Sequence, residues 1–207
     1  VAGTGWSCGN SDVVSKISST GFFDTVSGVD ISTETPSLAT LLNYDAVLLY
    51  TSASSQDPDT LGDNLADYSD AGGGVVVGFF TQNPFGSYLE GRWVSGGYPA
   101  VETLGQTRKS MQSLGTVHNP THPAMNMVSS FNGGSASHRP IGTTLALGAT
   151  LIAEWTDGTP LVVEAANQRQ LALLFYPSSS DCHSSPWDSS TDGDLLLANP
   201  QIGRAPC

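Results

Sequence analysis

The sequence predicts an α/β fold in which helices cover both faces of a mainly parallel β-sheet. Two observations carry this prediction. The runs Ala46 to Tyr50 and Val75 to Phe80 are continuously apolar, as in strands that are covered on both faces. The segment between them has the start, the apolar stripe and the glycine stop of a helix. Strands and helices alternate in this way over the first 80 residues, which is the pattern of a parallel sheet.

The elements of the first half have recognisable boundaries. Residues 1–3 predict the end of a first strand, and residues 10–21 predict a helix with Asn10 or Ser11 as its cap and Gly21 as its stop. Residues 23–32 alternate in polarity and predict the second strand. In the next long helix, Asp57 is the expected cap and Pro58 takes the first helical position.

Right-handed crossovers in such a sheet bring three loops to its carboxyl edge, namely those after Ala2, Tyr50 and Phe80. Ligand sites of α/β folds lie at that edge. Residues 81–140 are rich in loops, which favours a functional or interface-forming segment. From residue 145 onward, turns at 157–158 and 167–170 predict an added antiparallel hairpin, followed by a last strand and a short helix that Pro200 stops.

Composition bounds the class of partner. Only 13% of the 207 residues are charged, and 7 basic residues face 19 acidic ones, which gives a net charge of −12. This charge balance argues against nucleic acid as a partner, because binding to phosphates needs clustered Lys and Arg. Membrane insertion is not expected either, because no apolar run reaches the length of a membrane span. The low charge and the high Ser and Thr content favour an extracellular or cell-surface protein. The truncated first strand leads us to expect a single domain, residues 1–207, cut from a longer extracellular polypeptide.

Three cysteines fit one disulfide and one remaining thiol, Cys207. Cys8 follows the first strand and Cys182 follows the last, so both are expected at the same edge of a parallel sheet. We therefore predict a disulfide between Cys8 and Cys182, with Cys207 paired to another chain or free.

Five stretches give the chain a resemblance to a known family: NYDAVLLY, LADYSDAGGGVVVG, HPAMNMVSSF, EWTDGTPLVVE and GDLLLAN. Together they resemble the class I glutamine amidotransferase-like superfamily, and within it the ThuA-like domains of secreted proteins. The resemblance spans nearly the whole chain and implies a flavodoxin-like three-layer sandwich. Because these stretches consist mainly of fold-forming residues, the resemblance bears on architecture more than on activity.

Catalytic members of that superfamily carry a cysteine directly after the strand that GGGVVVGFF matches. This chain has Phe79 and Phe80 there, and an aromatic ring cannot attack a carbonyl. Thr81 is the nearest hydroxyl, and nothing in the sequence marks a histidine beside it. The resemblance therefore implies a member of the superfamily without its nucleophile, and we expect neither a catalytic residue nor a cofactor.

Two groups of residues are of types that bind metal ions, but their sequence surroundings do not match those of known metal sites. His118 and His122 have helical spacing, yet prolines at 120 and 123 forbid a regular helix between them. His122 matches a loop of the family in which a structural or substrate-contacting role is implied. A second group, Asp188, Asp192 and Asp194, resembles the start of a calcium loop but lacks the acidic residue at its end, so it is a weak candidate for calcium.

Aromatic side chains in or beside loops are the remaining candidates for ligand or interface contacts, although at least half of them are expected in the core. They are Trp6, Trp93, Tyr98, Trp155 and Trp187. Segments 81–101 and 116–140, which also carry Phe85, Tyr88, Met125, Met127 and Phe131, have the composition of an interface core.

Two functions compete on these grounds. The first is a non-catalytic extracellular structural or adhesive module that packs against copies of itself or against neighbouring domains of a longer chain, in a filament, sheath or surface layer. The second is a carbohydrate-binding or carbohydrate-active domain, with glycans as ligands. Its candidate groups are His122, Glu154, Asp157 and Glu164, but we expect the two glutamates to face solvent from a hairpin.

Overall fold

The computed structural model describes residues 1–5, 7–82, 88–103 and 107–202. Its centre is an eight-stranded sheet with the order β2-β1-β3-β4-β12-β11-β10-β7. The strands on one side of it are parallel: β1 (Ala2–Gly3), β2 (Val29–Asp30), β3 (Ala46–Tyr50), β4 (Gly74–Gly78) and β12 (Gln170–Leu173). This mainly parallel arrangement confirms the predicted fold class.

The antiparallel part of the sheet is larger than the predicted hairpin. It adds β11 (Pro160–Glu164), β10 (Thr150–Trp155) and β7 (Leu114–Val117) beyond β12. The loop-rich middle of the chain therefore supplies a strand of the main sheet. Two small sheets flank it, β5 (Val101–Thr103) with β9 (Thr144–Leu145) and β6 (Thr107–Lys109) with β8 (His138–Pro140).

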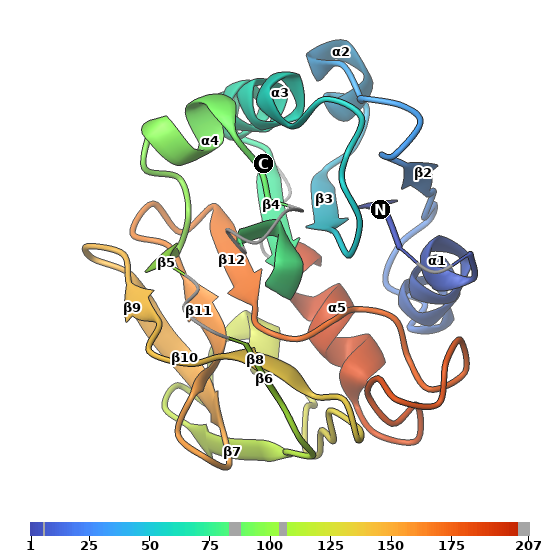
Figure 1. Ribbon diagram of the computed structural model, residues 1–207, viewed down its shortest axis with the longest axis vertical. Coiled ribbons are helices and arrows are strands. Elements are labelled where there is room, and N and C mark those ends of the chain that lie inside the picture. The colour runs from blue at the N-terminus through green and yellow to red at the C-terminus, as the bar shows by residue number, and fades with distance from the viewer. Residues whose placement is uncertain (6, 83–87, 104–106, 203–207) are drawn as a thin grey trace.

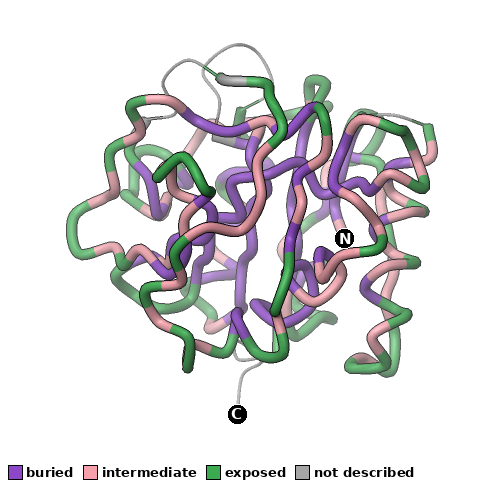
Figure 2. The backbone as a smooth tube through the Cα atoms, turned by 90° about the horizontal axis from the view of Figure 1, so that it is seen from below, coloured by how far each residue is buried: buried purple, intermediate pink, exposed green. Residues whose placement is uncertain are grey.

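Helices cover both faces of the sheet, as Figure 1 shows. One face carries α1 (Gly9–Ser19) and α5 (Gly193–Ile202), together with the short η2 (Pro123–Met125). The other carries α2 (Leu38–Leu41), α3 (Pro58–Asp70) and α4 (Gly91–Ser95). Successive residues of β4 point to opposite faces, so Val76 belongs to the first core and Val75 and Val77 to the second. Figure 2 shows the buried residues concentrated in the interior and the exposed ones along the outer loops.

Helix boundaries agree with the sequence where a side-chain cap decides them. Asp57 caps α3 by accepting a hydrogen bond from the Thr60 amide, and Pro58 begins the helix. Two boundaries were wrong. The cap position of α1 is Cys8, so the predicted caps Asn10 and Ser11 lie inside the helix, where Asn10 donates to the carbonyls of Gly3 and Val29.

The second wrong boundary is the end of the last helix. Pro200 lies inside α5, which continues to Ile202. In the last turn of α5, the side chain of Gln201 donates a hydrogen bond to the backbone carbonyl of Leu197 at 2.7 Å. No basic residue lies in this turn. Among the described residues, no helix is long and apolar enough to cross a membrane.

Candidate functional site

The carboxyl edge of the parallel strands is where the fold would hold a nucleophile. Strand β4 ends at Gly78 and continues into the one-turn helix η1 (Phe79–Gln82). Phe79 is fully buried, and the ring of Phe80 lies 4.8 Å from it, between centroids. The Thr81 hydroxyl is buried and donates back to the Gly78 carbonyl at 2.5 Å. At this strand end the described residues present two aromatic rings and a tethered hydroxyl.

Two aromatic side chains pack against the ring of Phe80. Its ring centroid lies 5.0 Å from that of His138, on β8, and 5.9 Å from that of Tyr176, in both cases edge to face. Burial lowers the pKa of His138, and the positive charge of Lys109 lowers it further. The imidazole Nδ1 is buried without a hydrogen-bond partner. This histidine therefore stays neutral near pH 7 and packs as an aromatic ring.

Polar groups at the same edge are engaged with one another. The Tyr50 hydroxyl donates to Asn10 Oδ1 at 2.7 Å, and the hydroxyls of Ser52 and Tyr176 lie 3.2 Å apart. Burial raises the pKa of Tyr50 far above its usual range, so this phenol does not ionise at physiological pH. These hydrogen bonds connect the loops of the edge; none of these groups is the activated nucleophile that acyl transfer requires.

A disulfide joins two loops of this edge. Cys8 and Cys182 are bonded, with their Cα atoms 5.6 Å apart, which confirms the predicted pairing. Lys16 of α1 also pairs with Asp181, next to the second cysteine. The disulfide and this ion pair tie α1 to the loop that precedes α5. Cys207 lies outside the described residues.

Three of the aromatic candidates for ligand contact were wrong. Trp93, Trp155 and Trp187 are each 1% exposed and belong to the two cores. The indole nitrogen of Trp155 donates to the Leu174 carbonyl at 3.3 Å, and that of Trp187 donates to the Pro177 carbonyl at 2.8 Å. A buried indole cannot stack on a ligand. Trp6 and Phe85 lie outside the described residues.

Tyr98 is half-buried and remains at the surface. Its ring stacks on Trp93 with centroids 5.6 Å apart, and its hydroxyl donates to Asp70 at 2.7 Å. Arg92 of α4 bonds to the same carboxylate and to Asp67, both on α3. These bonds from Tyr98 and Arg92 hold α4 against α3, so Tyr98 has a structural role.

The structure brings histidines and glutamates together in pairs. Nε2 of His122 lies 3.2 Å from Glu164 Oε1, and Nε2 of His118 lies 3.1 Å from Glu154 Oε2. The expectation that both glutamates face solvent was wrong: their side chains are only 15% and 21% exposed, because His118 and His122 of the loop after β7 lie against them.

The surroundings of His122 explain its position in the loop. Its Nδ1 accepts a hydrogen bond from the Ala124 amide at 3.1 Å and so caps η2. In the neutral ring the proton then sits on Nε2, directed at Glu164. The pair lines a hollow of about 360 Å³ at the amino edge of β12. Its geometry fits the structural role that the family loop implied.

The three aspartates proposed for calcium have separate partners. Asp188 accepts from the amide and hydroxyl of Ser190. Asp192 Oδ2 accepts from the amides of Ser129 and Ser130, at 2.8 and 2.7 Å, and from both hydroxyls. Burial acts to raise the pKa of Asp192, but these hydrogen bonds outweigh it and lower the pKa.

Asp194, the third aspartate, accepts from the Leu195 amide in the first turn of α5. Within the described ranges, no group of three or more His, Cys, Asp or Glu side chains could hold a metal ion. The structure therefore assigns these carboxylates to capping and loop hydrogen bonds. The bonds of Asp192 join two loops, since its partners lie 62 and 63 positions away in sequence.

Residues that the sequence did not single out are the exposed aromatics Phe22 and Tyr44. They are 38% and 42% exposed and line a hollow at the amino edge of the sheet. Gly21, with φ of 70°, follows α1 and directly precedes Phe22. In the sequence, this glycine was the one local sign that Phe22 begins a loop after a helix.

Comparison with known proteins identifies solved structures with a similar fold. No family model and no curated sequence matches the chain. A putative ThuA-like protein from Parabacteroides merdae is 17% identical, with a TM-score of 0.63, over 100% of this chain and 90% of that one. A cytoplasmic protein from Salmonella typhimurium is 13% identical, with a TM-score of 0.64, over 96% and 88%.

A putative GMP synthase subunit from Thermoplasma acidophilum is also similar. It is 12% identical, with a TM-score of 0.59, over 98% of this chain and 91% of that one. This chain therefore shares its fold with ThuA-like proteins and with the putative GMP synthase subunit, and its position after β4 holds Phe79 and Phe80.

Proposed function

We propose that this domain with a glutamine amidotransferase-like fold is a non-catalytic extracellular module, which packs against copies of itself or against neighbouring domains. The observation that carries the proposal is the end of β4. Phe80 occupies the nucleophile position and packs against His138 and Tyr176, so the space that a substrate carbonyl would need holds aromatic side chains.

Two further observations support an extracellular setting. The Cys8–Cys182 disulfide is of the kind that persists in oxidising compartments. The net charge of −12 comes with only 13% charged residues, so a surface of Ser, Thr, Gly and Asn meets the solvent.

The surface for assembly is smaller than the sequence indicated. The expectation that segments 81–101 and 116–140 form an interface core was wrong for Trp93, Met125 and Phe131, which are buried in their own domain. Tyr88, at 38%, and Met127, at 61%, remain exposed. Exposed apolar side chains in these segments are the contacts that we assign to neighbouring domains.

The absence of acyl-transfer chemistry can be tested at the strand end. We expect a fluorophosphonate probe to leave residues 79–82 of the wild-type chain unmodified, because the Thr81 hydroxyl is buried and donates to Gly78. A Phe80→Cys variant treated with iodoacetamide is the control, and its labelling shows that reagents reach this position. Mass-spectrometric detection of a probe adduct on Thr81 would contradict a non-catalytic role.

Assembly is tested by sedimentation velocity of the full chain over a range of concentrations. We expect association that increases with concentration and that weakens in Met127→Ser, since a hydroxyl replaces an exposed apolar group at a contact. Ser54→Ala, a small change on an exposed loop, serves as the matched control. A wild-type chain that stays monomeric at its highest soluble concentration would rule out self-association as the function.

A further inference from the structure

Two exposed aromatic rings face one hollow at the amino edge of the sheet. Phe22 follows α1 and Tyr44 precedes β3, and both line a hollow of about 510 Å³. Ile17 and Val26 contribute apolar wall to the same hollow. This edge is opposite to the one that holds Phe80, so the hollow is separate from the closed nucleophile position.

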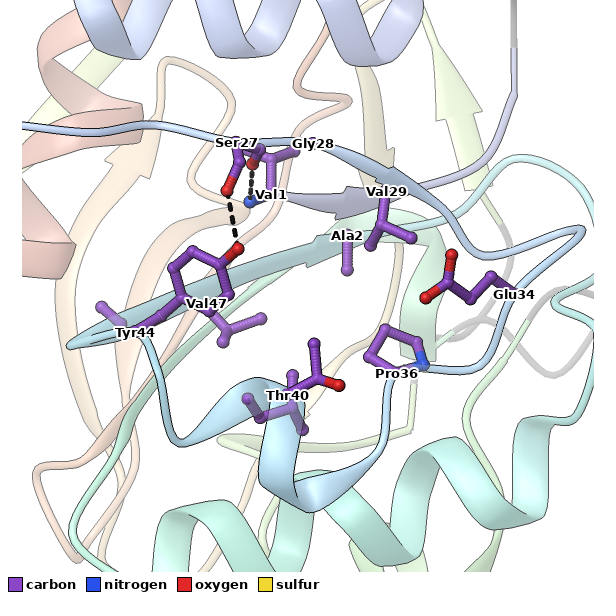
Figure 3. Close-up of a pocket in the computed structure, with 12 residues that line it drawn as sticks. Val1, Ala2, Ser27, Gly28, Val29, Glu34, Pro36, Thr40, Tyr44 and Val47 are labelled. Atoms are coloured by element: carbon purple, nitrogen blue, oxygen red, sulfur yellow. Dashed lines mark hydrogen bonds between the residues drawn. The ribbon is translucent and has the colours of Figure 1, made fainter.

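The ring of Tyr44 is held in place before any ligand arrives. Its hydroxyl accepts a hydrogen bond from Ser27 Oγ at 2.9 Å, drawn as a dashed line in Figure 3. Its backbone carbonyl accepts from the Tyr68 hydroxyl at 2.8 Å. Because the hydroxyl and the backbone of Tyr44 are both hydrogen-bonded, binding costs less conformational entropy than it would with a mobile ring.

Tyr44 also lines a second hollow. It measures about 260 Å³ and has Ala2, Val29 and Val47 among its apolar walls. Figure 3 shows the carboxylate of Glu34 at this hollow. The two hollows are neighbours, since both are lined by Val1, Ser27, Tyr44 and Ala46.

The polar side chains of this groove are rich in hydrogen-bond acceptors. Those that line the larger hollow are Asp24, Thr25, Ser27, Asn43, Asp45 and Gln201. Among the described residues that line either hollow, none is Lys or Arg. The amino group of Val1 lines both hollows, but it donates to the Ser27 carbonyl at 2.7 Å, and burial lowers its pKa to about 6. With a net charge of −12 on the chain, this lining disfavours phosphates, nucleic acids and acidic sugars.

We propose that the groove formed by the two hollows binds a neutral oligosaccharide. Sugar hydroxyls donate to carboxylate and amide oxygens, and the apolar C–H face of a sugar ring packs on an aromatic ring. Two adjacent spaces that share Tyr44 suit two successive sugar units. A protein partner fits less well, because it would bury Asp24, Asp45 and Glu34 and must bring cations to pair with them.

The test is calorimetric titration of the full chain with cellohexaose and with chitohexaose, and with a galacturonic acid hexamer for comparison. We expect binding of at least one neutral hexamer and none of the acidic one. Phe22→Ala and Tyr44→Ala are each expected to weaken binding at least ~tenfold, as loss of a stacking ring does. Tyr44→Phe keeps the ring and loses the Ser27 bond, so its loss should be smaller.

Leu147→Ala, at a residue that is 94% exposed and outside the groove, is the control and should bind as the wild type does. Near-UV circular dichroism establishes that each variant is folded. The proposal is overturned if the wild type binds neither neutral hexamer, or if Phe22→Ala and Tyr44→Ala bind them unchanged. If these variants alter sedimentation instead, without any sugar binding, the groove is a protein contact. Assembly through Met127 is measured separately, so either idea can fail alone.

Discussion

Replacing both Cys8 and Cys182 by serine is expected to lower the free energy of unfolding by about 4 kcal/mol. The disulfide joins residues 174 positions apart, so it removes a large part of the conformational entropy of the unfolded chain. It also ties the loop after β1 to the loop before α5, at the edge where Tyr50, Ser52 and Tyr176 are hydrogen-bonded.

The measurement is urea denaturation, followed by near-UV circular dichroism with and without dithiothreitol. The wild type should lose stability in the reductant, whereas the Cys8→Ser/Cys182→Ser double variant should be insensitive to it. If the oxidised and reduced wild type unfold at the same urea concentration, the disulfide has no part in stability, and its support for an oxidising compartment weakens as well.

Trp155→Ala is expected to cost about 3–5 kcal/mol of folding free energy, because it leaves a cavity in the core beneath β10. The indole is 1% exposed, packs against Phe131 with ring centroids 5.4 Å apart and donates to the Leu174 carbonyl. Trp155→Phe keeps most of the volume but leaves that carbonyl without its donor, so its cost should lie between those of the wild type and the alanine variant.

Thermal and urea unfolding measure this effect. Leu147→Ala is the matched large-to-small change at a residue 94% exposed, and we expect it to alter stability by no more than about 0.5 kcal/mol. Equal stabilities of Trp155→Ala and the wild type would show that the indole is not a core residue. Sugar binding by a folded Trp155→Phe variant should be unchanged, since the groove at Phe22 and Tyr44 does not include this residue.

The sequence by itself determined the elements whose signals are local. The continuous apolar runs of β3 and β4 mark strands that are covered on both faces, and the Asp57-Pro58 start fixes the beginning of α3. The order of these elements then determined the parallel sheet and the edge shared by Cys8 and Cys182. It also placed Phe79 and Phe80 directly after β4, where the structure has them.

Only the tertiary structure decided which loop residues are buried and which distant side chains meet. Trp93, Trp155 and Trp187 have the same local signal as exposed aromatics, but segments far away in sequence cover them. The pairing of His122 with Glu164 depends on the chain after β7 folding over β11, which no spacing in the sequence encodes.

The same holds for the groove that we propose as a sugar site. Phe22 and Tyr44 belong to separate connections, and their neighbours on the chain are ordinary loop residues. They face one hollow because β2 and β3 lie on either side of β1 in a parallel sheet, which brings the segments before these strands to the same edge. Burial and exposure are thus properties of the packed sheet, whereas strand and helix signals are properties of the local chain.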